Sequence, residues 1–178
     1  ETLEIQDGQI IARYRQELPH FIPEKKSQET LIKELEEVVR QSVEVHLRSD
    51  VPYGLFLSGG LDSATLLKFM SEASPNPVCT YTIGFSGTKM YDERDQAQLL
   101  ATHFKTDHHA IDFTQEDFWK MLPLVAKSCD DLIFDQAMLP TFKLASFAAQ
   151  DLKVVLSGEG GDELLGGYRR YQKAQLPW

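Results

Sequence analysis

Apolar and polar positions divide the chain into a short N-terminal part and a longer part in which strands and helices alternate. Residues 3–14 alternate loosely around Asp7-Gly8, and an Asp-Gly pair between two strand-like runs is typical of a β-hairpin. A linker follows, after which Ser27 can cap the first turn of a helix. The residues expected on one face of this helix are Leu31, Leu35, Val38, Ser42 and Val45.

The longer part repeats a unit in which a short apolar run is followed by a helical pattern. Short strands that alternate with helices form a parallel sheet with helices on both faces. We therefore expect an α/β fold, a doubly wound parallel sheet of five strands, with the hairpin as an N-terminal appendage. In the expected strand order 3-2-1-4-5 the first strand lies beside the fourth, so the loops after them share one crevice. The expected strands are 53–57, 78–83, 108–113 and 153–156, and the expected helices are 62–73, 92–104 and 140–149.

Composition and charge exclude several classes of function. The 178 residues, 42% of them apolar, suffice for one domain with a buried core. The formal net charge of -9, from 27 acidic and 18 basic side chains, disfavours nucleic-acid binding, because phosphates attract clustered lysine and arginine. Cys79 and Cys129 show no zinc-binding spacing, which favours a reduced, cytoplasmic setting. No apolar run approaches the roughly 20 residues that cross a bilayer, so no membrane association is expected.

Candidate chemistry begins where the strand expected at 53–57 runs into the segment Ser58-Gly59-Gly60-Leu61-Asp62-Ser63. The two glycines permit a tight turn whose N–H groups point toward an anion, and the next helix adds its positive N-terminal end. The segment therefore predicts a phosphate-binding loop, although neither the GxxxxGK[ST] nor the GxGxxG pattern is present. The alternative is a plain strand-to-helix turn in which Ser58 or Asp62 only caps the helix.

A second glycine-rich segment follows the strand expected at 153–156. It combines three glycines with the carboxylates of Glu159, Asp162 and Glu163, a composition that suits a ligand loop better than a helix interior. Because a carboxylate repels a bare phosphate, we expect Mg²⁺ between the two. Together the two loops predict a site for a metal–polyphosphate complex. The alternative is that Asp162 and Glu163 only cap the helix that follows, expected through Tyr168 to Tyr171.

Other residues that suggest chemistry are set aside. His108 and His109 are neighbours on one expected strand, so their side chains point to opposite faces and cannot both bind one ion. Arg169 and Arg170 are expected to be solvated or paired rather than to contact a phosphate. The residues at helical spacing that are expected in the core or at an interface are Phe118, Trp119 and Met121.

Both glycine-rich segments resemble those of known enzymes. SGGLDS at 58–63 is similar to the pyrophosphate-binding loop (PP-loop) of the N-type ATP pyrophosphatases, which include argininosuccinate, GMP and NAD synthetases. VVLSGEGGDELLGGY at 154–168 resembles the narrower asparagine synthetase family, with β-lactam synthetase as a close relative. The segments YDE at 91–93 and TDHH at 106–109 match that family too, and the hairpin that ends in Arg13-Tyr14 resembles the end of its glutaminase domain.

The resemblance covers essentially the whole chain and implies its organisation. Residues 1–25 would be the end of an N-terminal glutaminase domain with its linker. Residues 26–178 would be an asparagine synthetase (ATP pyrophosphatase) domain of the adenine nucleotide α-hydrolase-like fold, truncated before a lysine that the family carries further on. The family's glutaminase uses an N-terminal cysteine, and neither Cys79 nor Cys129 can take that part. Ammonia would therefore come from a glutaminase domain missing here.

Carried over to this sequence, the resemblance implies the residues of the site. The first loop would hold the pyrophosphate end of ATP, two strand ends would border the adenosine, and Glu159 would lie near the acyl-adenylate and the ammonia. The implied nucleotide-binding residues are Leu57, Ser58, Gly59, Gly60, Asp62, Ser63, Ile83, Ser157 and Gly158; the Mg²⁺ ligands are Asp62 and Asp162; and the catalytic residues are Asp62, Glu159 and Asp162.

The implied reaction is amide synthesis driven by ATP. An aspartate side-chain carboxylate would attack the α-phosphorus of ATP and release pyrophosphate, and ammonia would then convert the β-aspartyl-adenylate into asparagine and AMP. One alternative is a ligase or cyclase of the β-lactam synthetase type, which shares these loops. Another is a nucleotide-binding domain without catalytic activity, although Asp62, Glu159 and Asp162 are intact. The oligomeric state stays open, a homodimer included.

Overall fold

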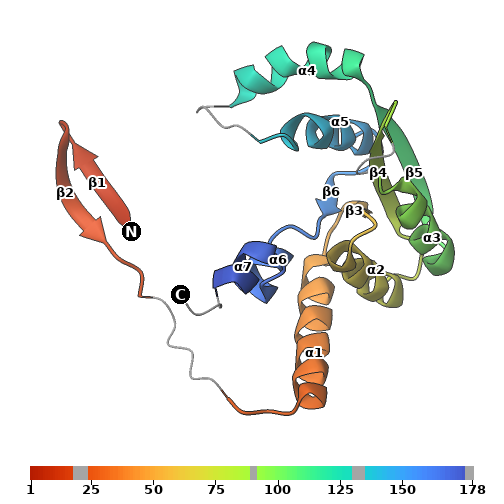
Figure 1. The fold of residues 1–178 in the computed structure, drawn as a ribbon, viewed down its shortest axis with the longest axis horizontal. Coiled ribbons are helices and arrows are strands. Elements are labelled where there is room, and N and C mark those ends of the chain that lie inside the picture. The colour runs from red at the N-terminus through yellow and green to blue at the C-terminus, as the bar shows by residue number, and fades with distance from the viewer. Residues whose placement is uncertain (18–23, 89–91, 130–134, 175–178) are drawn as a thin grey trace. The chain divides into compact units, whose positions relative to one another are not determined.

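The computed structural model describes residues 1–17, 24–88, 92–129 and 135–174 (Figure 1). The chain forms two compact units, residues 1–35 and residues 36–178. No helix within the described ranges is both long enough and apolar enough to cross a membrane.

The first unit begins with the predicted hairpin. Strand β1 (Thr2–Gln6) pairs with β2 (Gln9–Tyr14) in antiparallel register. Asp7 and Gly8 both have positive φ angles, 51° and 75°, which is the backbone of a type I′ turn and the reason that Asp-Gly is favoured there. The hairpin prediction is therefore confirmed.

Helix α1 (Gln28–His46) starts as predicted, and its buried side lies outside the set of residues predicted to share one face. The Ser27 hydroxyl accepts a hydrogen bond from the Thr30 amide at 3.2 Å, which confirms the cap. The buried residue is Val43, 2% exposed, and Val39 and Leu47 pack beside it against the core. The helix carries two apolar stripes, and its second half, which belongs to the second unit, contacts that unit's core through one of them. The residues predicted to share one face of the helix are all exposed: Leu31, Leu35, Val38, Ser42 and Val45.

The second unit is built on a parallel sheet in the order β5-β4-β3-β6. Tyr53 pairs with Val154, so the first strand lies beside the fourth, as predicted. The described residues contribute four strands rather than the five expected, in the expected order 3-2-1-4. The strands are β3 (Tyr53–Phe56), β4 (Cys79–Phe85), β5 (Asp107–Phe113) and β6 (Val154–Leu156).

Helices cover both faces of this sheet, as Figure 1 shows. On one face α2 (Leu61–Ala73) and α3 (Arg94–Phe104) pack with the second half of α1. On the other face α5 (Met138–Ala148) packs against β4 and β6. Burial on both sides explains the continuous apolar character of these strands and confirms the doubly wound α/β fold. The remaining helices are α4 (Gln115–Ser128), α6 (Gly161–Leu165) and α7 (Arg169–Ala174).

Helix α4 is held by polar contacts at its start and exposes part of its apolar surface. Thr114 and Asp117 form a capping box, and Lys143 of α5 binds the Asp117 carboxylate at 2.6 Å. Met121 packs against the core, as expected. Trp119 does not, because its side chain is 63% exposed and contacts the ring of Phe118. Of the two expected places for Trp119, the core is therefore excluded, and a place at an interface stays a prediction.

Candidate active site

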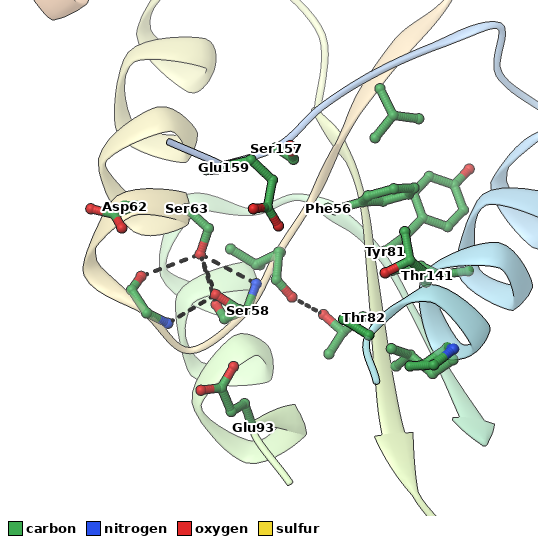
Figure 2. A pocket seen from close by; sticks show the side chains of 18 of the residues that line it. Phe56, Ser58, Asp62, Ser63, Tyr81, Thr82, Glu93, Thr141, Ser157 and Glu159 are labelled. Carbon is green, nitrogen blue, oxygen red and sulfur yellow. Dashed lines mark hydrogen bonds between the residues drawn. The ribbon is translucent and has the colours of Figure 1, made fainter. Parts of the chain in front are cut away.

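The loops after β3 and β6 border one cavity of about 550 Å³ at the carboxyl ends of the strands (Figure 2). Neighbouring parallel strands end at the same edge of a sheet, and the strand order reverses between β3 and β6, the position at which such sheets form a crevice between their loops. The volume is in the range of small-molecule sites. Its apolar wall consists of Phe56, Leu57, Tyr81, Ile83, Phe85, Pro140, Leu144 and Val155.

The first loop is closed by its own hydroxyl groups, drawn as dashed lines in Figure 2. The buried Ser63 hydroxyl accepts a hydrogen bond from the Ser58 amide at 3.2 Å and lies 2.9 Å from the Ser58 hydroxyl. The Ser58 hydroxyl also accepts a hydrogen bond from the Gly60 amide at 3.1 Å. At the start of the loop, the Leu57 carbonyl accepts a hydrogen bond from Thr82 of β4. Ser63 therefore shapes the loop from inside.

The helix behind this loop presents an N-terminus that no side chain caps. Gly60 is the N-cap residue of α2 and adopts an extended backbone, with φ -80° and ψ 160°. The interpretation that Ser58 or Asp62 caps α2 is wrong, because neither side chain bonds a first-turn amide of that helix. The first-turn N–H groups and the positive helix end are therefore available to an anion in the cavity.

The second loop packs closely against the first through its glycines. A Cβ atom on Gly161 would lie 2.7 Å from Cγ of Asp62, and one on Gly158 would lie 3.0 Å from Cβ of Asp62. A Cβ atom on Gly167 would lie 1.8 Å from a carboxylate oxygen of Asp162. The glycines thus leave room for two aspartate side chains, and Asp62 lies at the contact between the two loops.

Asp162 does not cap α6. The N-cap residue of that helix is Gly160, in the left-handed region with φ 89°, and no side chain bonds the helix N-terminus. Glu163 instead accepts a hydrogen bond from the Tyr168 hydroxyl at 2.8 Å, which lowers the pKa of the Glu163 carboxyl. The predicted helix through Tyr171 is divided into α6 and α7, and neither side chain caps α6, so the capping interpretation is wrong for the helix in which the two residues lie.

The cavity is strongly acidic. Five carboxylates line it, and no lysine or arginine is among its described lining residues. Within the described ranges, no hydrogen bond or ion pair engages four of the five, and Glu163 is the exception. Figure 2 shows Glu159 reaching from the second loop toward the first, with Glu93 beyond Ser58. The carboxylates belong to Asp62, Glu93, Glu159, Asp162 and Glu163.

The structure brings nearly all of the predicted site residues to this cavity. Gly59 is the exception, because it is not among the described residues that line the cavity. Its missing Cβ atom makes room for α3, because such an atom would lie 2.6 Å from Cβ of Gln96. Ile83 lines the cavity but precedes the end of β4, which extends to Phe85. The predicted residues that line the cavity are Leu57, Ser58, Gly60, Asp62, Ser63, Ile83, Ser157, Gly158, Glu159 and Asp162.

Several lining residues were not predicted. Thr82 lies on β4 beside the predicted Ile83, and its hydroxyl holds the Leu57 carbonyl. Glu93 belongs to the YDE segment, whose match to the asparagine synthetase family was the one available signal. Pro140 and Thr141 of α5 carried no signal, because only the packing of α5 on the sheet brings them to the cavity.

The histidines and arginines that were not expected to bind a ligand are absent from the described lining of the cavity. His108 and His109 do point to opposite faces: His108 Nδ1 is 2.9 Å from the Thr80 hydroxyl, whereas His109 stacks on Tyr81 at 5.1 Å. Burial lowers the pKa of His108, and His109 lowers it further. Arg170 lies over the ring of Tyr168, 4.3 Å from its centroid.

The fold and the loops define the class, an α/β domain with a ligand crevice at the switch point of its parallel sheet. Two solved structures share the fold, each with a TM-score of 0.51. The NH3-dependent NAD synthetase of Campylobacter jejuni is 19% identical, and the match covers 76% of this chain and 60% of that one. The glutamine-dependent NAD+ synthetase of Acinetobacter baumannii, in complex with ADP, is 22% identical, with coverage of 84% and 29%.

The chain belongs to the asparagine synthase family, whose sequence model matches residues 34–178. A protein of Methanocaldococcus jannaschii, provisionally named asparagine synthetase (glutamine-hydrolyzing) 2, is 39% identical over 87% of this chain and 30% of its own length. Asparagine synthetase (glutamine-hydrolyzing) 1 of Bacillus subtilis is 35% identical over 86% of this chain and 24% of its own length. Asparagine synthetase B (glutamine-hydrolyzing) of Escherichia coli is 32% identical over 95% of this chain and 33% of its own length. The chain thus spans about a quarter to a third of these relatives.

Proposed function

We propose that this domain catalyses ATP-dependent synthesis of asparagine, with AMP and pyrophosphate as the other products. In this reaction the side-chain carboxylate of aspartate is adenylated and then attacked by ammonia. The observation that carries the proposal is the convergence of two loops, one with an uncapped helix N-terminus and one rich in carboxylates, on a single cavity. The family and the names of the relatives support it.

The shape of the cavity suggests how ATP binds. The pyrophosphate end would lie against the first loop, where the α2 N-terminus offers its amides. The adenosine would lie on the apolar wall near Leu57 and Ile83, with Ser157 and Gly158 on the other side. Ser58 and Ser63 would act mainly by keeping the loop in the shape that directs its amides at the phosphates.

The acidic lining fits a Mg²⁺ ion bound together with ATP. No group of three potential ligands that could hold a metal by itself occurs among the described histidine, cysteine, aspartate and glutamate residues. Mg²⁺ is commonly held by one or two carboxylates together with phosphate oxygens and water. Asp62 and Asp162 are assigned as these ligands, because both line the cavity and no described residue pairs with either carboxylate. The ion would neutralise the pyrophosphate as it leaves.

The side chains have separate tasks in this proposal. The first loop orients the triphosphate so that the aspartate carboxylate attacks the α-phosphorus in line with the departing pyrophosphate. Glu159, whose side chain extends over the cavity in Figure 2, lies near the acyl-adenylate and can accept a proton as ammonia attacks.

The organisation of the full protein is part of the proposal. Residues 1–25 are assigned to the end of a glutaminase domain with its linker, and residues 26–178 to the synthetase domain. Ammonia would come from glutamine hydrolysis in the glutaminase domain, as the names of the relatives suggest. We also assign the protein to the cytoplasm, where its small substrates are present.

Isotope exchange between pyrophosphate and ATP tests the proposal. With the full-length protein, labelled pyrophosphate should enter ATP only when both Mg²⁺ and aspartate are present, and a chelator should abolish the exchange. Added ammonia should then yield asparagine and AMP in equal amounts. Exchange that does not depend on aspartate would contradict the assigned acceptor, and the absence of exchange would contradict adenylation.

A further inference from the structure

Outside the two loops, the described residue with the densest set of polar contacts at this edge of the sheet is Arg94, at the start of α3. Its guanidinium forms a bidentate ion pair with Asp92, with Nε–Oδ1 at 2.9 Å and Nη2–Oδ2 at 2.6 Å. Its remaining nitrogen, Nη1, binds the Asp112 carboxylate of β5. Arg94 thereby connects the first turn of α3 to the carboxyl end of the sheet.

The guanidinium also packs against the backbone of β4 at Gly84. A Cβ atom on Gly84 would be 2.0 Å from Nε of Arg94 and 2.6 Å from its Cζ. Gly84 pairs directly with Asp112 in the β4–β5 register, so the arginine spans two neighbouring strands at one level. Only a glycine at this position leaves the space that the guanidinium occupies.

The helix turn held in this way touches the phosphate loop. A Cβ atom on Gly59 would lie 2.6 Å from Cβ of Gln96 and 3.5 Å from Cβ of Glu93, so the start of α3 packs on the loop at its outer side. Ser63 supports the loop from its inner side. The loop therefore lies between α2 and the first turn of α3.

We propose that Arg94, with Asp92, Asp112 and Gly84, is a positioning device that fixes the start of α3 and through it the phosphate loop and Glu93. Arg94 does not line the cavity. Its expected effect on the reaction rests on the proposed function. Nucleotide binding depends on the direction of the loop amides, and a displacement of about 1 Å can cost on the order of 100-fold in rate.

Arg40 provides a matched control. Its guanidinium also pairs with two carboxylates, Glu36 and Glu72, and also packs against a neighbouring group, with its Cζ 4.9 Å from the centroid of the Phe69 ring. The two arginines are similarly exposed, 34% for Arg40 and 30% for Arg94. Arg40 joins α1 to α2 and does not line the cavity. A purely stabilising role would give both arginines the same effect.

The first measurement is hydrogen–deuterium exchange of the full-length protein, which does not depend on activity. Arg94→Ala should accelerate amide exchange in the peptide that covers residues 57–63, whereas Arg40→Ala should leave that peptide unchanged. Gly84→Ala should reproduce the effect of Arg94→Ala, because it displaces the guanidinium without removing any charge. Unchanged protection of the loop in both Arg94→Ala and Gly84→Ala would overturn the proposal.

The second measurement is the exchange of pyrophosphate into ATP by the same variants. Arg94→Ala should lower kcat/KM on the order of tenfold to 100-fold, chiefly through KM for MgATP, with Arg40→Ala close to wild type. Arg94→Lys should recover only part of the loss, because an ammonium group cannot form the planar fork. Wild-type KM in Arg94→Ala would show that Arg94 does not position the loop for the nucleotide. If the wild-type protein showed no pyrophosphate exchange, the proposed function would fail, while hydrogen–deuterium exchange would still decide whether Arg94 positions the loop.

Discussion

The two glycine-rich loops that meet at the cavity are stabilised in different ways. The first loop is closed by hydrogen bonds among Ser58, Gly60 and Ser63, and it leads into a helix of 13 residues. The second has a left-handed glycine at Gly160 and leads into a helix of 5 residues. Its close contacts are with Asp62 and with its own Asp162. The first loop thus carries its shape in its own polar side chains, whereas the second takes its shape from glycine backbone freedom and packing.

The largest expected effect comes from the two aspartates, one in each loop. Asp62→Asn and Asp162→Asn keep the side-chain shape and remove one unit of ligand charge. In the full-length protein, each should slow pyrophosphate exchange by roughly tenfold to a thousandfold, about 1.4 to 4 kcal/mol of barrier. Equal losses would show that the loops share one metal site despite their different construction.

Glu159→Gln is the control for these aspartate variants. It should leave nucleotide affinity nearly unchanged and impair the later steps that involve the acyl-adenylate and ammonia. Wild-type exchange rates in both aspartate variants would disprove the metal assignment.

The next effect concerns the internal bonds of the first loop. Ser63→Ala removes the buried hydroxyl that accepts the Ser58 amide, so the free energy of unfolding should fall by about 1 to 3 kcal/mol. Ser157→Ala in the second loop is the matched control, since its side chain is exposed, and it should change stability by less than about 0.5 kcal/mol. Urea denaturation of both variants measures the difference. Equal free energies of unfolding for Ser63→Ala and Ser157→Ala would show that the first loop does not depend on its internal hydrogen bonds more than the second loop does.

A smaller effect is expected from the left-handed glycine of the second loop. Gly160→Ala should destabilise the protein by roughly 1 to 2 kcal/mol, because a residue with a Cβ atom is strained at φ 89°. No neighbouring atom lies within 4 Å of the added Cβ, so the cost is one of backbone conformation alone. Gly160→Asn should be milder, since asparagine tolerates this region. If both variants matched wild type in urea denaturation, the second loop would not depend on this conformation.

The smallest effect concerns the hydrogen bond from Tyr168 to Glu163 at the exposed end of the second loop. It lowers the pKa of Glu163 below its ordinary value of 4.5. Its contribution to stability is therefore complete above that value and is lost as the pH falls through the lowered one. Tyr168→Phe should lower the melting temperature slightly at neutral pH, and the difference should vanish in acid. A constant difference across the titration would contradict this assignment.

Local sequence signals predicted much of the fold. Asp7-Gly8 specified a hairpin turn because both positions need positive φ, and the apolar runs specified strands because both faces of the sheet are covered. They also predicted that Asp62 and Asp162 would share one crevice, since their loops follow strands paired as predicted. These features depend on residues close together in the chain or on a general rule of sheet topology.

Tertiary packing alone decided the rest. The buried stripe of α1 contains Val43 rather than Val38, because both stripes satisfy the helical period and only contact with the core selects one. No signal in the sequence indicated that the missing Cβ atom of Gly59 makes room for Gln96 of α3, a contact between distant segments. Glu93 reaches the cavity lining because the start of α3 packs against the first loop. Periodicity and motifs describe what a segment can do, whereas the choice among equivalent faces and neighbours is made only when the segments pack together.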